Sequence, residues 1–149
     1  MKVGIYLQHY LTHKLIVCLM VEGDNKIKTN GFMTGLSVTD GIDGRDIMMV
    51  SLKPMKEAVM VSKIKPILRE LNTFNYDCLF DIKNFIGLGN WCDAYDDYFD
   101  AWFADAQTVK KLALQCPYPI FQYFLAHHYD VFGLIDAGLA IPMKIYDFK

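Results

Sequence analysis

The sequence lacks long hydrophobic runs, paired cysteines and a strong excess of either charge. The apolar N-terminal stretch is interrupted by His9, His13 and Lys14 before it reaches the roughly 18 residues that a membrane-spanning helix needs, and no small-residue cleavage site follows it. The four cysteines form neither a CxxC pair nor a zinc-binding spacing with histidine. We therefore expect a cytoplasmic protein with free thiols, without a signal peptide or a membrane span.

The common catalytic and nucleotide-binding motifs are also missing. No GxxxxGK[ST], GxSxG or HExxH sequence occurs, and the single Gly-x-Gly, at 87–89, has no third glycine. Only three serines are present, and none has the setting of a nucleophile. These absences exclude a P-loop and make a dinucleotide site or a serine hydrolase a poor interpretation.

What is present is enough apolar material for one folded domain. The chain has 149 residues, 53% of them hydrophobic, so we predict a single domain over residues 1–149. Its net charge of −2 argues against a histone-like basic binder. Most of the acids are aspartates, 14 against 3 glutamates, and they gather in the C-terminal half. Aspartate is a weak helix former but a good cap and metal ligand.

The hydrophobic periodicity predicts strands first and an alternation of helices and strands later. We predict strands at 2–11, 14–21, 26–38, 45–52, 76–80 and 120–125, and helices at 54–71, about 91–114 and 131–140. Pro66 should kink or split the first of these helices. The predicted fold is therefore α+β or α/β: an initial antiparallel meander, then β–α–β alternation, forming a mixed sheet with helices packed on it.

Three carboxylates fall where such a fold could gather them. Glu57 lies on the first predicted helix, Asp81 at the end of a predicted buried strand, and Asp136 eight residues after His128. Carboxylate oxygens are the ligands that Mg²⁺ prefers, and two such ions can drive phosphodiester cleavage. Each acid also has an ordinary structural interpretation, as a helix-end charge, a cap or a polar face.

The order of elements and three short segments resemble the ribonuclease H-like superfamily. The segments are MKEAVMVSKIKPIL with Glu57, YDCLFDIKNFI with Asp81, and AHHYDVFGLIDAGLA with His127 or His128 and Asp136. The resemblance implies metal-dependent cleavage of nucleic acid, with Glu57, Asp81 and Asp136 binding Mg²⁺ or Mn²⁺ and His128 assisting catalysis. Two features depart from the family's pattern: the first predicted strand, KVGIYLQHYL, has no acid, and DAYDDYFDAWFAD replaces basic substrate-binding residues. Whether the chain is an enzyme therefore stays open.

The most distinctive segment is this acidic and aromatic stretch itself. Asp93, Asp97 and Asp100 are spaced four and three residues apart, with Asp96 beside them, so a helix would present them on one face. The segment is either an ordinary solvated amphipathic helix or a surface that binds a basic partner. The sequence thus leaves two functions: nucleic-acid binding or cleavage, and a non-enzymatic interaction or inhibitor protein that docks on a basic surface.

Overall fold

The computed structural model describes residues 6–13, 15–20, 27–40, 46–53, 59–60 and 64–143. The chain divides into two compact units, and each is considered by itself. Residues 1–68 and 134–149 form the strand unit, and residues 69–133 form the helical unit, which interrupts the strand unit in sequence. The predicted α+β class is confirmed, because the chain contains both a sheet and helices. The single domain over residues 1–149 stays a prediction.

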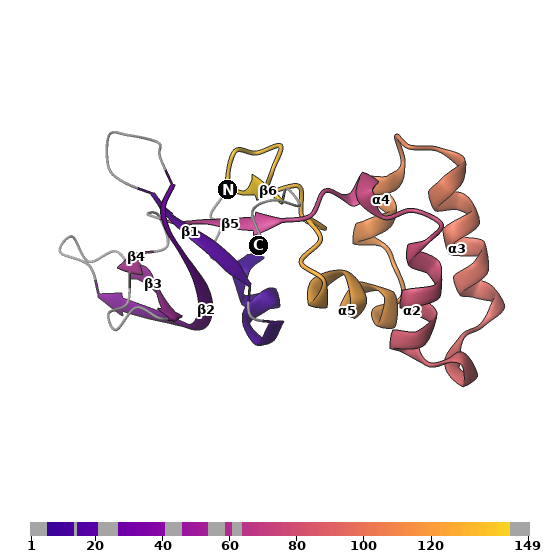
Figure 1. Cartoon of the computed structure of the whole chain (residues 1–149), viewed down its shortest axis with the longest axis horizontal. Coiled ribbons are helices and arrows are strands. Elements are labelled where there is room, and N and C mark those ends of the chain that lie inside the picture. Colours follow the sequence, from indigo (N-terminus) through magenta and orange to yellow (C-terminus); the bar gives the residue numbers. More distant parts are fainter. Residues whose placement is uncertain are drawn as a thin grey trace. The chain divides into compact units, whose positions relative to one another are not determined.

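The strand unit contains one mixed sheet with the order β4-β3-β2-β1-β5-β6 (Figure 1). Its strands are β1 Ile16–Met20, β2 Ile27–Asp40, β3 Asp46–Lys53, β4 Val59–Met60, β5 Ile64–Leu68 and β6 Ile141–Pro142. All neighbours pair antiparallel except β5 and β6, which are parallel. The predicted meander is confirmed in part: the expected strands 14–21, 26–38 and 45–52 pair antiparallel as β1, β2 and β3, but the expected first strand, 2–11, is not among them. The predicted β–α–β alternation is wrong, because β1 to β5 all precede helices α2 to α5 and only β6 follows them.

Two of the predicted elements in the strand unit have the wrong type. The described part of the expected strand 2–11 is helical, with a 3-10 helix, η1, over Gln8–His13. Leu7 and Tyr10 are both fully buried, and a helix places residues three apart on one side whereas a strand would place them on opposite faces. The helix expected over 54–71 is replaced by β4 and β5 in its described parts.

Strand β5 explains why helical spacing was misleading in this segment. Ile64, Pro66, Ile67 and Leu68 are all buried although their side chains alternate between the two faces of the sheet, where β5 lies between β1 and β6. A nearly continuous apolar run is typical of a strand covered on both faces, but it also satisfies a helical template. Pro66, expected to kink a helix, lies opposite Val17 of β1 instead.

The helical unit is built from short helices. They are η3 Leu71–Thr73, α2 Cys78–Ile86, η4 Leu88–Asn90, α3 Asp93–Ala104, α4 Val109–Leu114 and α5 Tyr118–Ala126. The helix predicted at about 91–114 is confirmed in type but is broken after Ala104, where the Asp105 carboxylate accepts a hydrogen bond from the Gln107 backbone N–H at 2.9 Å. Such an Asx turn competes with helix continuation.

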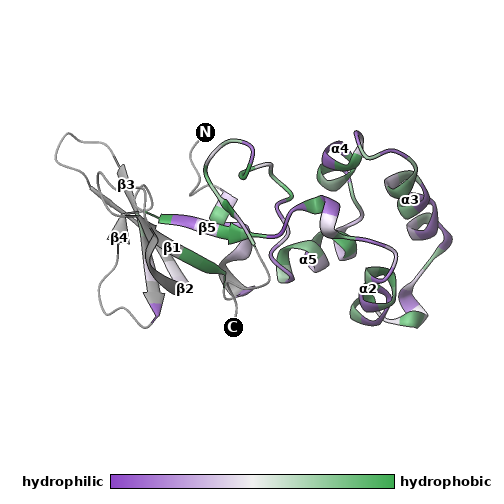
Figure 2. Ribbon diagram, turned by 45° about the horizontal axis from the view of Figure 1, so that its top comes forward, coloured by the Kyte–Doolittle hydropathy of each residue, from purple (hydrophilic) through white to green (hydrophobic). Residues whose placement is uncertain are grey.

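The remaining predictions for this part of the chain are wrong. The expected strands at 76–80 and 120–125 are the start of α2 and the body of α5, and 131–140 forms turns rather than a helix. In α5, Ile120, Tyr123 and Phe124 are buried at helical spacing. The ribbon of α5 is accordingly coloured hydrophobic along most of its length in Figure 2. A nine-residue apolar segment fits either a helix or a buried strand, and packing decided between them.

Aromatic side chains form the core of the helical unit, with Phe74 at the centre. Phe74 is 2% exposed. Six aromatic rings have their centroids between 5.2 and 6.2 Å from that of Phe74: those of Phe99, Trp102, Phe103, Tyr123, Phe124 and Tyr129. Stacked and edge-to-face pairs at these separations add to the free energy gained by burial alone. This core fixes the orientation of α3 and α5, which carry the candidate sites.

Candidate functional site

Helix α3 divides its residues completely between a core face and a solvent face. The five aromatic residues are buried or half-buried: Tyr95, Tyr98, Phe99, Trp102 and Phe103. The other seven are all exposed, and every one is aspartate or alanine: Asp93, Ala94, Asp96, Asp97, Asp100, Ala101 and Ala104. We call these seven residues the Asp/Ala face. All four aspartates that the sequence singled out thus lie on one solvent-facing surface.

The aspartates on this face differ in what surrounds them. The Asp96 carboxylate accepts a hydrogen bond from the Trp91 indole N–H at 2.9 Å, and the Lys83 ammonium lies 5.3 Å from the centroid of the same indole. Within the described parts of the chain, the side chains of Asp93, Asp97 and Asp100 have no hydrogen-bond or ion-pair partner. Three carboxylates are therefore left to water or to an external cation.

These acids are costly for an isolated helix. Like charges three or four residues apart destabilise a helix by about 0.2–0.5 kcal/mol per pair. Asp93 and Asp96 recover part of this cost, because they lie in the first turn, where the helix dipole favours negative charge. Asp97 and Asp100 lie beyond that turn and have no such compensation.

The helical unit as a whole is also negatively charged. Residues 69–133 contain nine Asp and Glu against four Lys and Arg, a formal charge of −5, and the strand unit has eight acids against eleven bases, or +3. The negative charge that the sequence placed in the C-terminal half therefore belongs to one compact unit. Such a field attracts basic surfaces and repels phosphates.

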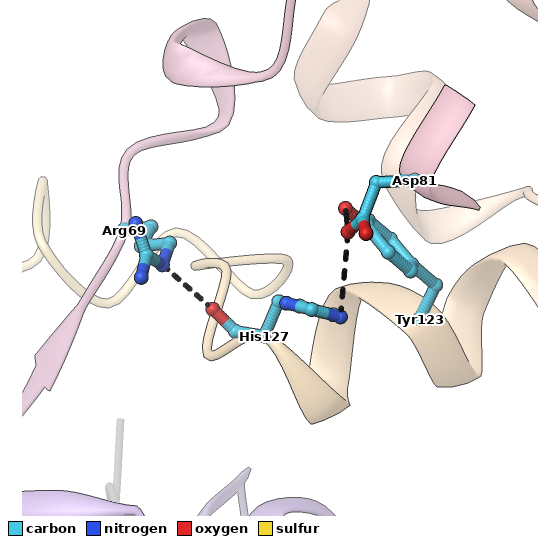
Figure 3. Close-up of polar contacts among 4 residues, drawn as sticks. All are labelled: Arg69, Asp81, Tyr123 and His127. Carbon is cyan, nitrogen blue, oxygen red and sulfur yellow. Dashed lines mark hydrogen bonds and ion pairs between the residues drawn. The ribbon is translucent and has the colours of Figure 1, made fainter. Parts of the chain in front are cut away.

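A second polar constellation joins α2 to α5 (Figure 3). The Tyr123 hydroxyl donates a hydrogen bond of 2.7 Å to Asp81 Oδ2, and His127 Nε2 lies 3.8 Å from the same oxygen. Burial, and then the hydrogen bond to Asp81, raise the pKa of Tyr123, so the phenol stays protonated and remains a donor. The Arg69 Nε–H donates to the His127 backbone carbonyl at 3.1 Å. These contacts hold the Asp81 carboxylate in place, although the Asp81 side chain is 61% exposed.

The structure corrects the position of two predicted site residues. Asp81 does not end a strand but lies in the first turn of α2, where a carboxylate also favours the helix dipole. Of the two candidate histidines, His127 is the one near Asp81. His128 has a φ of +62° and its carbonyl accepts a hydrogen bond from the Arg69 backbone N–H at 2.7 Å. Tyr123 was missed, although its four-residue spacing from His127 would have indicated it had the segment been interpreted as a helix.

The described residues include only two of the three members of the predicted metal site. Glu57 lies outside them, Asp81 belongs to the helical unit, and Asp136 lies exposed in a turn of the strand unit. In the ranges that the structure describes, no group of three or more His, Cys, Asp or Glu side chains could hold a metal ion. Coordination of Mg²⁺ or Mn²⁺ by Glu57, Asp81 and Asp136 stays a prediction.

Comparisons with known proteins add no relative from which a function could be transferred. Neither the scan against protein-family models nor the searches of curated proteins and of solved structures gives a match to this chain. No helix within the described ranges is both long and apolar enough to cross a membrane. The evidence for function is therefore the chemistry of the Asp/Ala face and of the cluster formed by Asp81, Tyr123 and His127.

Proposed function

We propose that the helical unit is a docking module that binds a basic segment of a partner protein through the Asp/Ala face of α3. The observation that carries this proposal is the composition of that face: all seven exposed residues of α3 are aspartate or alanine, with no lysine or arginine among them. A helix that only needs to be soluble usually mixes charges of both signs, because pairs at i and i+4 then attract. Here they repel.

Charge and size act together on this surface. Asp93, Asp97 and Asp100 supply carboxylates without partners among the described residues, and the alanines between them let the backbone of a partner approach closely. Long basic side chains can then lie across the alanines and reach the carboxylates. The aromatic core behind α3 holds the helix in place before binding, so the carboxylates are presented from a fixed backbone and less entropy is lost on association.

Binding and cleavage of nucleic acid by a ribonuclease H-like fold is the alternative function. It is supported by the mixed sheet with its antiparallel meander and one parallel pair. It requires Glu57, Asp81 and Asp136 to share Mg²⁺ or Mn²⁺. The charge of −5 on the helical unit disfavours it, because a phosphate backbone is attracted by positive charge.

Removal of three charges from the Asp/Ala face tests the docking function. The full chain is titrated into a fluorescein-labelled 16-residue peptide of alternating Lys and Ala, and into a labelled RNA/DNA hybrid of similar length. The test variant is Asp93→Asn, Asp97→Asn and Asp100→Asn together. Its matched control removes three exposed acidic charges elsewhere in the helical unit, with Glu70→Gln, Asp77→Asn and Asp105→Asn.

The proposal predicts a graded result. Exposed ion pairs are worth about 0.2–1 kcal/mol each, so the test variant should bind the peptide roughly 3- to 150-fold more weakly. The control should weaken binding much less, because its acids lie outside the face, and added salt should weaken binding by the unmodified chain. Equal losses of peptide affinity in both variants would show that only the net charge matters, and would refute the Asp/Ala face as the binding surface. Preference for the hybrid over the peptide would support the alternative function.

A further inference from the structure

Beside the Asp/Ala face, Tyr76 forms the outer layer of an aromatic stack that begins in the core. Its ring stacks on Phe103 of α3 with a centroid separation of 4.1 Å and an interplanar angle of 23°. Phe103 in turn lies 6.2 Å from Phe74, with nearly parallel rings. Tyr76 is nevertheless 70% exposed. One face of this ring is therefore held by the core stack, and the other is available to a ligand.

Carboxylates border this stack. Asp100 precedes Phe103 by three residues on α3 and Asp96 precedes it by seven, so both lie at the edge of the Asp/Ala face that adjoins Phe103. Asp100 is among the acids without a side-chain partner in the described parts of the chain. The surface thus combines a rigid aromatic plate with negative charge at its edge.

A comparable setting with an internal cation lies just before α3. Near the start of α3, the Lys83 ammonium lies 5.3 Å from the Trp91 ring centroid, and the Trp91 N–H is bonded to the Asp96 carboxylate. Aromatic ring, carboxylate and internal cation occur together there. At Tyr76 and Asp100 the ring and the carboxylate are present, and no described residue supplies the cation. This surface is therefore suited to bind a cation supplied by a partner.

We infer that the group seated on Tyr76 is an arginine side chain of the basic partner, with its guanidinium stacked on the exposed ring and its N–H groups directed at Asp100. This inference rests on the proposed docking function and specifies its partner as arginine-bearing. A planar guanidinium can stack on a ring and still donate hydrogen bonds from its edge. A lysine ammonium is a compact, strongly hydrated point charge. It can lie over a ring, as Lys83 does over Trp91, but it has no plane to stack on the ring while it donates hydrogen bonds from its edge.

Two peptides of equal length and charge test the inference on the full chain. One alternates Arg and Ala, the other Lys and Ala, and binding is measured by fluorescence anisotropy at the same low salt concentration. A cation–π contact at an exposed site corresponds to about a 2- to 5-fold gain in affinity. The unmodified chain should prefer the arginine peptide by a factor no larger than this, because a lysine ammonium also gains part of a cation–π contact.

Variants of the exposed rings assign the preference to Tyr76. Tyr76→Ala should abolish the preference for arginine, because it should weaken binding of the arginine peptide more than binding of the lysine peptide, and Tyr76→Phe should keep the preference. Phe80→Ala is the matched control, because Phe80 is 73% exposed and lies four residues further on, in α2. Tryptophan fluorescence confirms that each variant is folded. The comparison of the two peptides on the unmodified chain needs no variant.

The failures of the two proposals are distinguishable. Equal, salt-sensitive binding of both peptides would overturn the arginine inference and leave the docking function intact. Failure to bind either peptide would overturn both. A chain that is dimeric in solution, and becomes monomeric when Asp93, Asp97 and Asp100 are changed to Asn, would assign the face to a second copy and also overturn the arginine inference.

Discussion

Truncation of Phe74 should destabilise the helical unit more than any surface change. Phe74→Ala removes the ring that the six aromatic neighbours surround and leaves a cavity at the centre of the unit. Burial of a phenylalanine that is truncated to alanine is typically worth about 3–5 kcal/mol. Because Phe74→Ala also removes the contacts with six aromatic rings, we expect a loss of stability near the upper end of this range.

The size of this effect is large against the stability available. Domains of ordinary stability unfold with about 5–15 kcal/mol, so Phe74→Ala should remove about a fifth or more of the total. Phe80→Ala deletes the same atoms from a side chain that is 73% exposed. Substitutions at such positions usually change stability by less than about 0.5 kcal/mol. The difference in stability loss between Phe74→Ala and Phe80→Ala therefore measures the effect of burial, because the residue type removed is the same.

Urea unfolding followed by tryptophan fluorescence measures this difference. Both tryptophans, Trp91 and Trp102, belong to the helical unit, so their emission reports on that unit rather than on the sheet. With an m-value of about 1–3 kcal/mol/M, Phe74→Ala should lower the midpoint by at least about 1 M. A loss below about 1 kcal/mol, or an equal loss for Phe80→Ala, would refute Phe74 as the centre of the core.

Three further predictions concern single residues. Burial raises the pKa of Cys116 from its ordinary value near 9 to about 11, so its thiol is protonated in the folded chain at pH 8. Iodoacetamide should therefore alkylate Cys116 at least about tenfold more slowly in native protein than in urea, and equal alkylation rates would contradict this. The stability that the protonated Cys116 thiol contributes should be present below pH 9 and lost toward pH 11. Because His128 has a φ of +62°, His128→Val should cost about 1–2 kcal/mol in urea unfolding and His128→Asn clearly less, and equal costs would count against backbone strain there. If the chain is a nuclease, cleavage of an RNA/DNA hybrid, duplex or junction with Mg²⁺ or Mn²⁺ should disappear in Asp81→Asn, and lack of cleavage by the unmodified chain would end that hypothesis.

Local periodicity was sufficient where one element repeats its pattern over several turns. In α3, aromatic residues recur at helical spacing and aspartates occupy the opposite side, so the helix and its acidic face could both be predicted. The strands β2 and β3 were also predictable, because β-branched and apolar residues lie between clear turn signals. In these elements the neighbours along the chain carry the information.

Short apolar runs were assigned wrongly because burial alone does not select a type of structure. The residues of β5 and α5 are nearly all apolar, and each run fits both a buried strand and a buried helix. Pairing with β1 and β6 decided the first, and packing of Tyr123 and Phe124 around Phe74 decided the second. These partners are distant in sequence, and a local pattern contains no information about them.

The candidate sites divide in the same way. The amino-acid sequence alone determined that the C-terminal half is acidic and that Asp93, Asp97 and Asp100 share a face, because charge and helical spacing are local properties. Only the tertiary structure decided that Asp81 meets Tyr123 and His127, and that Tyr76 lies exposed on Phe103. These contacts join residues between 27 and 46 positions apart. They exist because the aromatic core brings α2, α3 and α5 together, and that packing is a property of the folded chain.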